Sequence, residues 1–333
     1  MPSSSRASSV ESTRFKPIQR PIFLAGAERS GTTMLRLMLD HHPQIAWCNE
    51  FEYAVDWMGD DGSYPDLGFY YEQLALNRIF QATNFEIDRS LSYPELVNSF
   101  LQQRRDRPGK PLIGATVHRN FHRLPYLWPN ARFIHIHRDG RDVARSCVRM
   151  GWAGNVWKGA DRWIRDERQW ARFAPQIPGD RQIEITYQEL VADHEATLSR
   201  VCDFIGVAYS PHMLDYVHST DYDLPNPHLI QQWRDTLGDR EIQLLEGRIG
   251  PMLVERGYEL SGLPPLACPP PLRLWLTIQS WWAHVSVRIE RYGLPLFLSE
   301  YVTRRLNLKP WQRQIRQRLN AIDKTYLKKS WSD

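Results

Sequence analysis

A glycine-bounded loop near the N-terminus has the residue types and the spacing that bind phosphate. Residues 26–33 read GAERSGTT, which is the spacing of the phosphate-binding loop GxxxxGK[ST]. Glycines let the backbone turn tightly, so that successive N–H groups face phosphate oxygens, and the N-terminus of a following helix adds partial positive charge. We therefore expect an anionic group to be held by Arg29, Ser30, Gly31, Thr32 and Thr33.

One position of this loop departs from the nucleotide-hydrolysing pattern. Thr32 replaces the usual lysine, and Arg29 stands inside the loop. Without that lysine, and without an apolar run ending in a metal-holding aspartate, phosphoryl transfer from ATP with Mg²⁺ is disfavoured. A sulfuryl group carries less negative charge than a γ-phosphoryl group, so Arg29, Thr32 and Thr33 can stabilise it without metal. A phosphotransferase and a glycine turn that binds nothing remain as alternatives.

A second anion-binding motif lies about a hundred residues further along the chain. The apolar run 133–137 is followed by Arg138 and then by the sequence DGRD. Because ligands bind at the carboxyl ends of parallel strands, Arg138 is expected at a binding site. Ser146 lies eight residues on, about two helical turns, so both side chains can approach one phosphate.

Together the two motifs resemble the sulfotransferase family that uses 3′-phosphoadenosine 5′-phosphosulfate (PAPS), in the branch of tyrosylprotein sulfotransferases and bacterial relatives. The resemblance covers roughly residues 21–260. It implies transfer of a sulfuryl group from PAPS to an acceptor hydroxyl or amine, with 3′-phosphoadenosine 5′-phosphate (PAP) as product and no metal. It also implies that residues 29–33 grip the 5′-phosphosulfate, that Arg138 and Ser146 hold the 3′-phosphate, and that Tyr187 contacts the nucleotide.

The resemblance also indicates the residue that removes the acceptor proton. Glu50 stands 21 residues after Arg29, the spacing of the catalytic glutamate in the tyrosylprotein branch. A positioned carboxylate typically contributes ~10²–10⁴-fold to such a reaction. Glu52, a base from the segment 51–107, and a surface role for Glu50 are the alternatives. Ser219 matches the family serine that stabilises the bridging oxygen as the sulfate bond breaks.

One family element has no counterpart in this chain. Relatives carry a Lys-Thr-Pro-like element whose lysine supports the leaving group, whereas residues 114–119 read GATVHR. We expect His118 or Arg119 to supply the positive charge, and we favour His118 because a histidine can also donate a proton. A purely structural histidine is the alternative.

These residues must be positioned by alternating strands and helices. Apolar runs predict strands over 21–26, 111–115, 132–137 and 181–187, and helical spacing of apolar residues predicts helices over 32–40, 142–149 and 195–204. Such alternation predicts an α/β fold, a P-loop-like open parallel sheet flanked by helices. Residues 51–107 lack the alternation and are expected to form helices and loops beside the site, where acceptor specificity lies.

Composition divides the chain into three parts. Residues 1–19 are expected to form a flexible leader, and residues 20–262 the catalytic domain. Residues 263–272 hold five prolines and predict a linker, and the rest of 263–333 is rich in Trp, Lys and Arg. This basic extension predicts amphipathic helices that pack against the catalytic domain or a second subunit, or lie on an anionic membrane surface. A non-catalytic nucleotide-binding scaffold at a membrane is therefore an alternative to an enzyme.

The bulk properties exclude several other classes of protein. A formal net charge of +4 is too small to indicate a nucleic-acid-binding protein. The four cysteines form no CxxC pair, and His135 and His137 lack a third ligand, so no metal site or disulfide framework is expected. No signal peptide and no run of ~20 apolar residues is present, which predicts a cytoplasmic protein. The acceptor stays open between a glycan, a lipid, a small metabolite and a protein tyrosine.

Overall fold

A computed structural model describes residues 17–306 and 308–325 of the chain. Most of the predicted leader, residues 1–16, lies outside the described residues, as do Lys328 and Lys329 of the basic extension. The described chain contains these strands: β1 (Ile22–Ala25), β2 (Ile45–Glu50), β3 (Leu112–Val117), β4 (Arg132–His137) and β5 (Gln182–Thr186).

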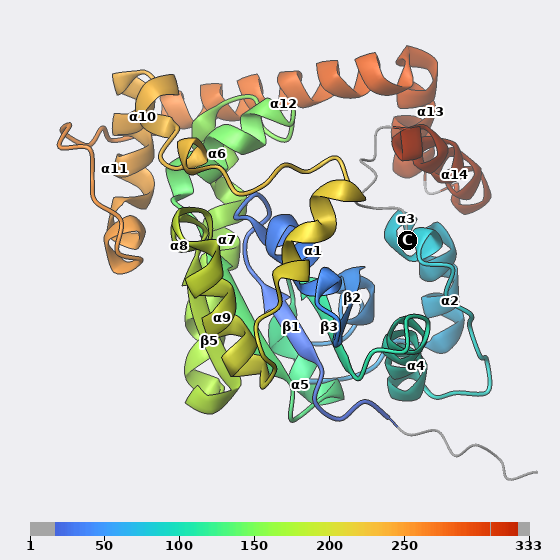
Figure 1. The fold of residues 1–333 in the computed structure, drawn as a ribbon. Coiled ribbons are helices and arrows are strands. Elements are labelled where there is room, and N and C mark those ends of the chain that lie inside the picture. The colour runs from blue at the N-terminus through green and yellow to red at the C-terminus, as the bar shows by residue number, and fades with distance from the viewer. Residues whose placement is uncertain (1–16, 307, 326–333) are drawn as a thin grey trace, which may run out of the picture.

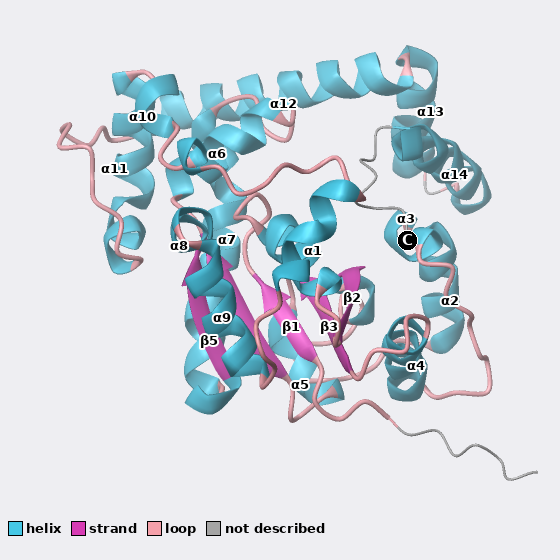
Figure 2. Cartoon of the chain, in the orientation of Figure 1, coloured by secondary structure: helices cyan, strands magenta, loops and turns pink. Residues whose placement is uncertain are grey.

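The strands form one parallel sheet in the order β2-β3-β1-β4-β5 (Figure 2). In the centre, Ile22 of β1 pairs with Gly114 of β3 on one side and with Arg132 of β4 on the other. Parallel strands need crossover connections, and helices supply them here. The predicted class, an open parallel sheet flanked by helices with further helices at the C-terminus, is confirmed.

Helices cover both faces of this sheet (Figure 1). The helices that follow strands or pack on the catalytic part are α1 (Thr32–His41), α5 (Leu124–Leu127), α6 (Gly140–Arg149), α7 (Val156–Phe173), α8 (Tyr187–Ala192), α9 (His194–Ile205), α10 (Trp233–Thr236) and α11 (Asp239–Glu255). The predicted helix-and-loop segment contains α2 (Leu67–Leu76), α3 (Arg78–Ala82) and α4 (Tyr93–Asp106). Short 3₁₀ helices join several of these, among them Glu52–Ala54 and Pro211–His218.

Alternation along β1 divides the hydrophobic core between the two faces of the sheet. Phe23 and Ala25 belong to one cluster, which continues into the residues of α4. Ile22 and Leu24 belong to another, which continues into α1 and α9. Successive side chains of a strand point to opposite faces, so a strand buried on both faces is apolar throughout, as β1 is. The sheet is thus fixed from both sides, and its carboxyl edge is left for loops.

The C-terminal extension forms α12 (Pro270–Tyr292), α13 (Leu294–Arg305) and α14 (Lys309–Thr325). In Figure 1, α12 crosses beyond the carboxyl ends of the strands, and α13 and α14 turn back toward α2. The amide of Asn320 donates to the carbonyl of Leu76, at 3.1 Å, which ties α14 to α2. The helix begins at Pro270, three residues inside the segment predicted as a linker, because proline is tolerated in the first helical turn. Within the described residues, no helix is long and apolar enough to cross a membrane.

Candidate active site

The glycine-bounded loop joins β1 to α1 and takes an unusual backbone conformation. Arg29 and Gly31 both have positive φ, 74° and 96°. A Cβ on Gly31 would lie 2.4 Å from Cδ2 of Tyr187, so only glycine lets the loop approach that ring. A left-handed arginine is uncommon and strained, and such residues gather at ligand-binding sites. The conformation of the loop therefore depends on the left-handed backbone of Arg29 and on the close contact between Gly31 and the ring of Tyr187.

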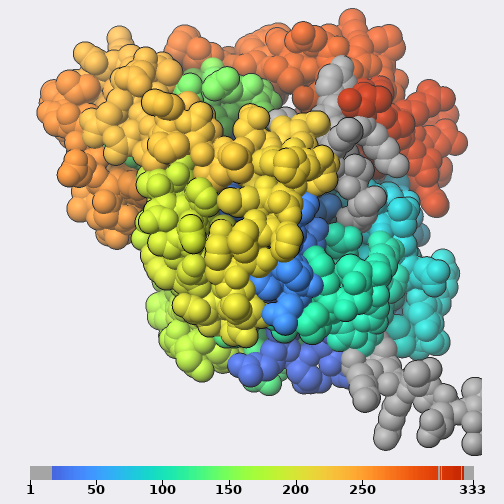
Figure 3. Space-filling view, in the orientation of Figure 1, coloured from blue at the N-terminus to red at the C-terminus, as the bar shows by residue number. Residues whose placement is uncertain are grey.

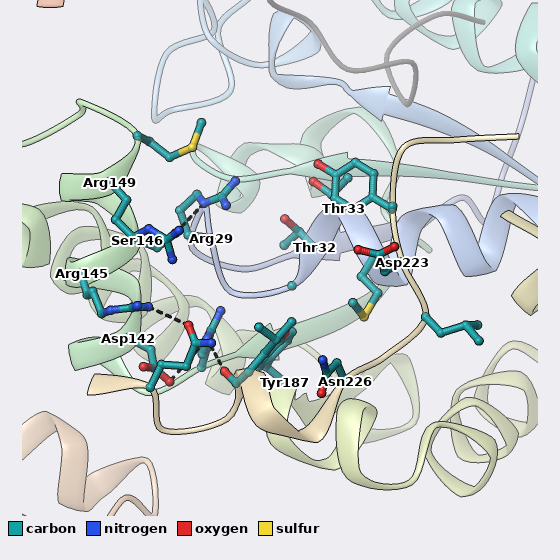
Figure 4. Close-up of a pocket in the computed structure, with 18 of the residues that line it drawn as sticks. Arg29, Thr32, Thr33, Asp142, Arg145, Ser146, Arg149, Tyr187, Asp223 and Asn226 are labelled. Carbon is teal, nitrogen blue, oxygen red and sulfur yellow. Dashed lines mark hydrogen bonds and ion pairs between the residues drawn. The ribbon is translucent and has the colours of Figure 1, made fainter. Parts of the chain in front are cut away.

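The loop forms one wall of a cavity of about 510 Å³. Figure 4 shows the labelled side chains of the loop, of α6 and of Tyr187 facing this space. Arg29 and Arg138 both line the cavity, so the two motifs that lie far apart in sequence share one site. The predicted residues that line it are Arg29, Gly31, Thr32, Thr33, Arg138, Ser146 and Tyr187.

Direct contacts join the two motifs. Nε of Arg29 donates a hydrogen bond to Oγ of Ser146, at 2.9 Å, across 117 residues of sequence. The guanidinium of Arg138 lies over the ring of Tyr187, 4.2 Å from its centroid, and donates to the carbonyl of Leu229. The Nε atom of Arg138 is buried and makes no hydrogen bond to any described residue. Nη2 of the same guanidinium pairs with Oδ2 of Asp142, at 3.4 Å. A buried donor without a partner is costly, so an anionic ligand at this end of the cavity would lower that cost.

The cavity has further residues that the sequence analysis did not select. Arg145 and Arg149 add two cations, and Nη1 of Arg145 donates to Oε1 of Gln232, at 2.7 Å. Helical spacing could have predicted both arginines, because positions 138, 142, 145, 146 and 149 fall on one face of a helix. The loop 221–232 closes the other side through Asp223 and Asn226 (Figure 4). No local pattern distinguishes that loop, and only the folded chain brings it to the cavity.

A small recess adjoins the cavity on the side of β2 and β3. Thr32 and Thr33 line both spaces, and the recess adds Asn49, Glu50 and Thr116 together with Arg36 and His118. Oε1 of Glu50 lies 3.9 Å from Nε2 of His118. The other ring nitrogen of that histidine, Nδ1, donates to the carbonyl of Gly26, at 2.8 Å. The imidazole is thus fixed between the start of the loop and the carboxylate.

The electrostatics of the recess shift the pKa values of its groups. Burial, together with the neighbouring Glu52 carboxylate, raises the pKa of Glu50 to about 7, although 27% of its side chain remains exposed. Burial alone would lower the pKa of His118, but the carboxylates of Glu52 and Glu50 outweigh it and raise that pKa. Carboxylates in a low-dielectric site protonate more readily, and nearby acids favour a charged imidazolium. The recess can therefore accept and donate protons near neutral pH.

The alternative candidates occupy different positions. Glu52 is 5% exposed, and its Oε1 accepts from the backbone N–H of His118, at 2.8 Å, so this carboxylate supports the histidine from inside the protein. Arg119 points elsewhere and forms a two-bonded ion pair with Asp56, at 2.9 and 2.5 Å. Ser219 does not line the cavity, and its Oγ lies 3.0 Å from Nε2 of His41.

Ser30 and His135, which the sequence also singled out, are both buried inside the protein. Ser30 of the loop is fully buried, and its hydroxyl has no hydrogen-bond partner among the described residues. His135 is also buried, where it contacts the carboxylates of Glu167 and Glu184. Within residues 17–306 and 308–325, no group of three or more His, Cys, Asp or Glu is arranged to hold a metal ion.

The sequence of the chain matches a known family over the region that contains the glycine-bounded loop, Glu50 and Arg138. The model of the Sulfotransferase family matches residues 21–211, more than half of the chain, and this protein therefore belongs to the sulfotransferase family. Membership of the family supports an enzyme that transfers sulfuryl groups, and it confirms the resemblance predicted from the two motifs.

The relatives share limited identity over most of the chain. Protein-tyrosine sulfotransferase 2 from Gallus gallus is 22% identical over 277 residues, which cover 73% of this chain and 71% of that protein. Protein-tyrosine sulfotransferase A from Caenorhabditis elegans is 22% identical over 268 residues, which cover 73% and 68%. Among solved structures, the sulfotransferase domain of the Synechococcus PCC 7002 olefin synthase has a TM-score of 0.48 at 18% identity, and the match covers 74% of this chain and 98% of that domain.

Proposed function

We propose that this protein transfers the sulfuryl group of PAPS to an acceptor hydroxyl, with Glu50 as the general base and without metal. The observation that carries the proposal is the single cavity lined by both Arg29 and Arg138. Two separated cationic groups in one cavity suit a ligand with anionic groups at both ends, and PAPS has a 5′-phosphosulfate and a 3′-phosphate. The cavity volume of about 510 Å³ falls in the range of small-molecule sites.

The residues present fit the donor chemically. Arg29, Thr32 and Thr33, at the N-terminus of α1, would hold the 5′-phosphosulfate, because a helix N-terminus and a guanidinium both favour negative charge. Arg138 would hold the 3′-phosphate, and its buried Nε without a partner supports that role. Ser146 and Tyr187 complete the cavity around the two arginines. PAPS supplies the activated sulfuryl group, whose bond to the 5′-phosphate breaks as the acceptor oxygen bonds to sulfur.

We assign to Glu50 the role of the general base that removes the proton of the acceptor hydroxyl. A hydroxyl is a weak nucleophile, and a general base is most effective when its pKa lies near the working pH. The pKa of about 7 for Glu50 meets this condition, and its position in the recess beside Thr32 and Thr33 supports contact with the reacting groups.

We assign to His118 the role of stabilising the negative charge that develops on the departing phosphate oxygen. Its raised pKa favours the imidazolium, which can stabilise that oxygen or donate a proton to it. The backbone hydrogen bonds from Nδ1 to Gly26 and from the His118 N–H to Glu52 hold the ring in place for this task. In this proposal His118 takes the place of the family lysine that the chain lacks, while Ser219 keeps only the role implied by the resemblance.

The experiment that tests the function has a binding part and a turnover part. Isothermal titration calorimetry with PAP, in buffer containing a metal chelator, should show saturable binding to the full chain, whereas ATP with Mg²⁺ should bind weakly. Radiolabelled PAPS should then be offered to a panel of acceptors from the four open classes, with mass identification of the product. Tight binding of ATP with Mg²⁺ and none of PAP would refute the proposal. Binding of PAP with no hydrolysis or transfer on any acceptor would favour the non-catalytic scaffold.

A further inference from the structure

Exposed apolar side chains gather on the first helix of the C-terminal extension. A folded chain usually leaves large apolar residues exposed singly rather than in a group. On α12 the exposed fractions are 62% for Leu274, 57% for Trp275, 47% for Ile278, 56% for Trp281 and 58% for Trp282. The two adjacent tryptophans contact each other edge to face, with ring centroids 4.8 Å apart. This group is too large and too aromatic for an ordinary solvent-facing helix.

The exposed residues form one stripe that runs along α12. Their positions 274, 275, 278, 281 and 282 follow the helical spacing i, i+1, i+4, i+7 and i+8. Leu276 and Ser280 lie on the opposite side, where Leu276 packs against Trp157 and Leu244, and Ser280 accepts from the N–H of Gly154. The helix is therefore attached to the catalytic part by one face and presents an apolar face to the outside. Figure 3 shows α12 as the orange row along the upper edge of the molecule.

Charge is distributed to match an anionic surface. Residues 263–333 contain 12 Lys and Arg but only 4 Asp and Glu, so their formal charge of +8 exceeds the +4 of the whole chain. The rest of the chain is consequently net acidic. On α12 itself, Arg273 is exposed beside the apolar stripe, whereas Arg288 pairs with Glu300 and Nε2 of His284 contacts the carbonyl of Trp152. In α13, Arg304 and Arg305 are exposed next to the exposed side chains of Tyr301 and Val302.

We propose that α12 docks this protein onto an anionic phospholipid surface, with its tryptophan stripe inserted at the headgroup level and the exposed arginines of the extension near the lipid phosphates. Tryptophan suits this position because its ring is apolar while its N–H can still hydrogen-bond. A helix of this kind lies in the plane of the interface, and each Lys or Arg near an anionic leaflet strengthens binding. The proposal does not depend on the reaction that the cavity catalyses.

A second copy of the chain fits the same face less well. If two α12 helices paired through their stripes, a two-fold axis would bring the two C-terminal extensions close together. Like charges held close together destabilise such an interface, and the +8 extension of one copy repels that of the other. An anionic bilayer satisfies both the apolar stripe and the charge, so we assign the face to lipid.

The test is co-sedimentation of the full chain with sucrose-loaded vesicles. Vesicles of phosphatidylcholine alone should sediment little protein, and vesicles with about one third phosphatidylglycerol should sediment most of it, with binding that weakens as salt is raised. The variant Trp281→Ser/Trp282→Ser should bind anionic vesicles at least roughly tenfold more weakly, because two interfacial aromatic side chains are lost. The matched control is Phe69→Ser/Tyr126→Ser, which removes two aromatic side chains that are 44% and 48% exposed on the catalytic part. This control should bind vesicles like the unaltered chain.

Two measurements keep the outcomes separate. Calorimetric binding of PAP and the thermal melting temperature show whether each variant is folded, and sedimentation velocity over a range of concentrations shows self-association. Equal sedimentation of the tryptophan variant and the unaltered chain would overturn the proposal, as would the absence of binding to anionic vesicles. A concentration-dependent dimer that the tryptophan variant loses, without vesicle binding, would assign the face to a second copy instead.

Discussion

The arginine-lined cavity and the Glu50 recess adjoin each other but differ in how the charge of their side chains is set. The cavity, of about 510 Å³, is lined by four arginines, at positions 29, 138, 145 and 149, and by three aspartates, at positions 142, 221 and 223. The recess is narrow, and the carboxylates of Glu50, Glu52 and Glu28 all act on His118. The four guanidinium groups of the cavity keep their positive charge, whereas Glu50 and His118 of the recess are groups whose charge depends on their surroundings. In the reaction proposed above, this difference separates binding from proton transfer.

The chemistry of the side chains explains this division. A guanidinium stays protonated in any protein environment, so an arginine-lined cavity binds anions over a wide pH range. Carboxylates and imidazoles change charge with burial and with their neighbours. Glu28 illustrates the balance, because burial would raise its pKa, but His118 and Arg162 outweigh burial and lower it. Variants in the two regions should therefore affect different measurements.

The largest expected effect comes from Glu50→Gln. Removing the general base should lower kcat roughly 10²–10⁴-fold. The affinity for PAP should stay within about twofold, because Glu50 is not among the residues that line the cavity. Turnover of radiolabelled PAPS and calorimetry with PAP measure the two quantities.

A surface glutamate on α2 supplies the matched control for this variant. Glu72→Gln makes the same chemical change at an exposed position and should leave both quantities unchanged. Normal turnover in Glu50→Gln would remove Glu50 from its assigned role, whereas joint loss of turnover and PAP binding would show that the two regions are not separable.

The pH dependence of turnover should come from the recess alone. Because the base must be ionised and burial raises the pKa of Glu50 to about 7, kcat/KM should fall roughly tenfold per pH unit below 7. PAP binding should change little over the same interval, since the groups proposed to hold the ligand are arginines. A pH–rate profile of the unaltered chain, with parallel calorimetry, tests both statements. A rate that is flat down to pH 5 would contradict the assignment of the base.

The ionisation of Glu50 should affect folding stability in the direction opposite to its effect on turnover: turnover rises with pH, whereas stability falls. The pKa of Glu50 is higher in the folded chain than its ordinary value of 4.5, so the folded state binds this proton more tightly than the unfolded state. The contribution of Glu50 to stability is therefore fully present below pH 4.5 and is lost as the pH rises through about 7. In Glu50→Gln this loss should disappear, which thermal melting at pH 5 and pH 8 would detect.

Arg138→Ala tests the cavity rather than the recess. Hydrogen bonds to charged groups are worth about 1.5–3 kcal/mol, so the Kd for PAP should rise roughly 10- to 100-fold. The control Arg168→Ala removes an exposed arginine of α7 and keeps the net charge of the two variants equal. Turnover at saturating PAPS should recover most of its normal rate in Arg138→Ala. A loss of kcat with normal affinity would place Arg138 in the transfer step instead.

The sequence predicted the strands whose apolar pattern is continuous, and it did not predict β2. β1, β3, β4 and β5 each lie within two residues of the predicted ranges, because buried parallel strands read as apolar runs. β2 was not predicted, because IAWCNE is apolar only in its first four residues and lies just after Pro43 and Gln44. Its register depends on a long-range contact in which Trp47 covers Gly114, where a Cβ would lie 2.1 Å from the ring. Nothing in the local sequence expresses that contact.

In the candidate site, too, the sequence predicted the local motifs but not the properties that depend on tertiary contacts. The loop and Arg138 belong to motifs that are local in sequence, and the fold brings them to one cavity. The shift in the pKa of Glu50 depends on Glu52 and on the burial of β2, which are tertiary properties. Likewise, the return of α14 to α2 through Asn320 could not be anticipated from helical spacing alone. Motifs predict which groups take part, whereas packing determines their charge.

The smallest expected effect belongs to Ser146→Ala, which also tests how the two motifs are linked. The Ser146 hydroxyl accepts a hydrogen bond from Nε of Arg29, and it lines the cavity near the other arginines. Losing one such bond is worth about 1 kcal/mol, so the Kd for PAP should rise roughly fivefold. Ser286→Ala, in which an exposed helical serine that donates to Trp282 is removed, is the matched control.

The double variant decides whether that serine acts on the ligand or through Arg29. If Ser146 mainly positions the arginine, its removal should cost little once Arg29→Ala is already present, and the two effects on PAP affinity should not add. If Ser146 contacts the ligand independently, the two losses should add within about 0.5 kcal/mol. Additivity would therefore mean that the Arg29–Ser146 bond is incidental, and that the two motifs meet only through the nucleotide they both bind.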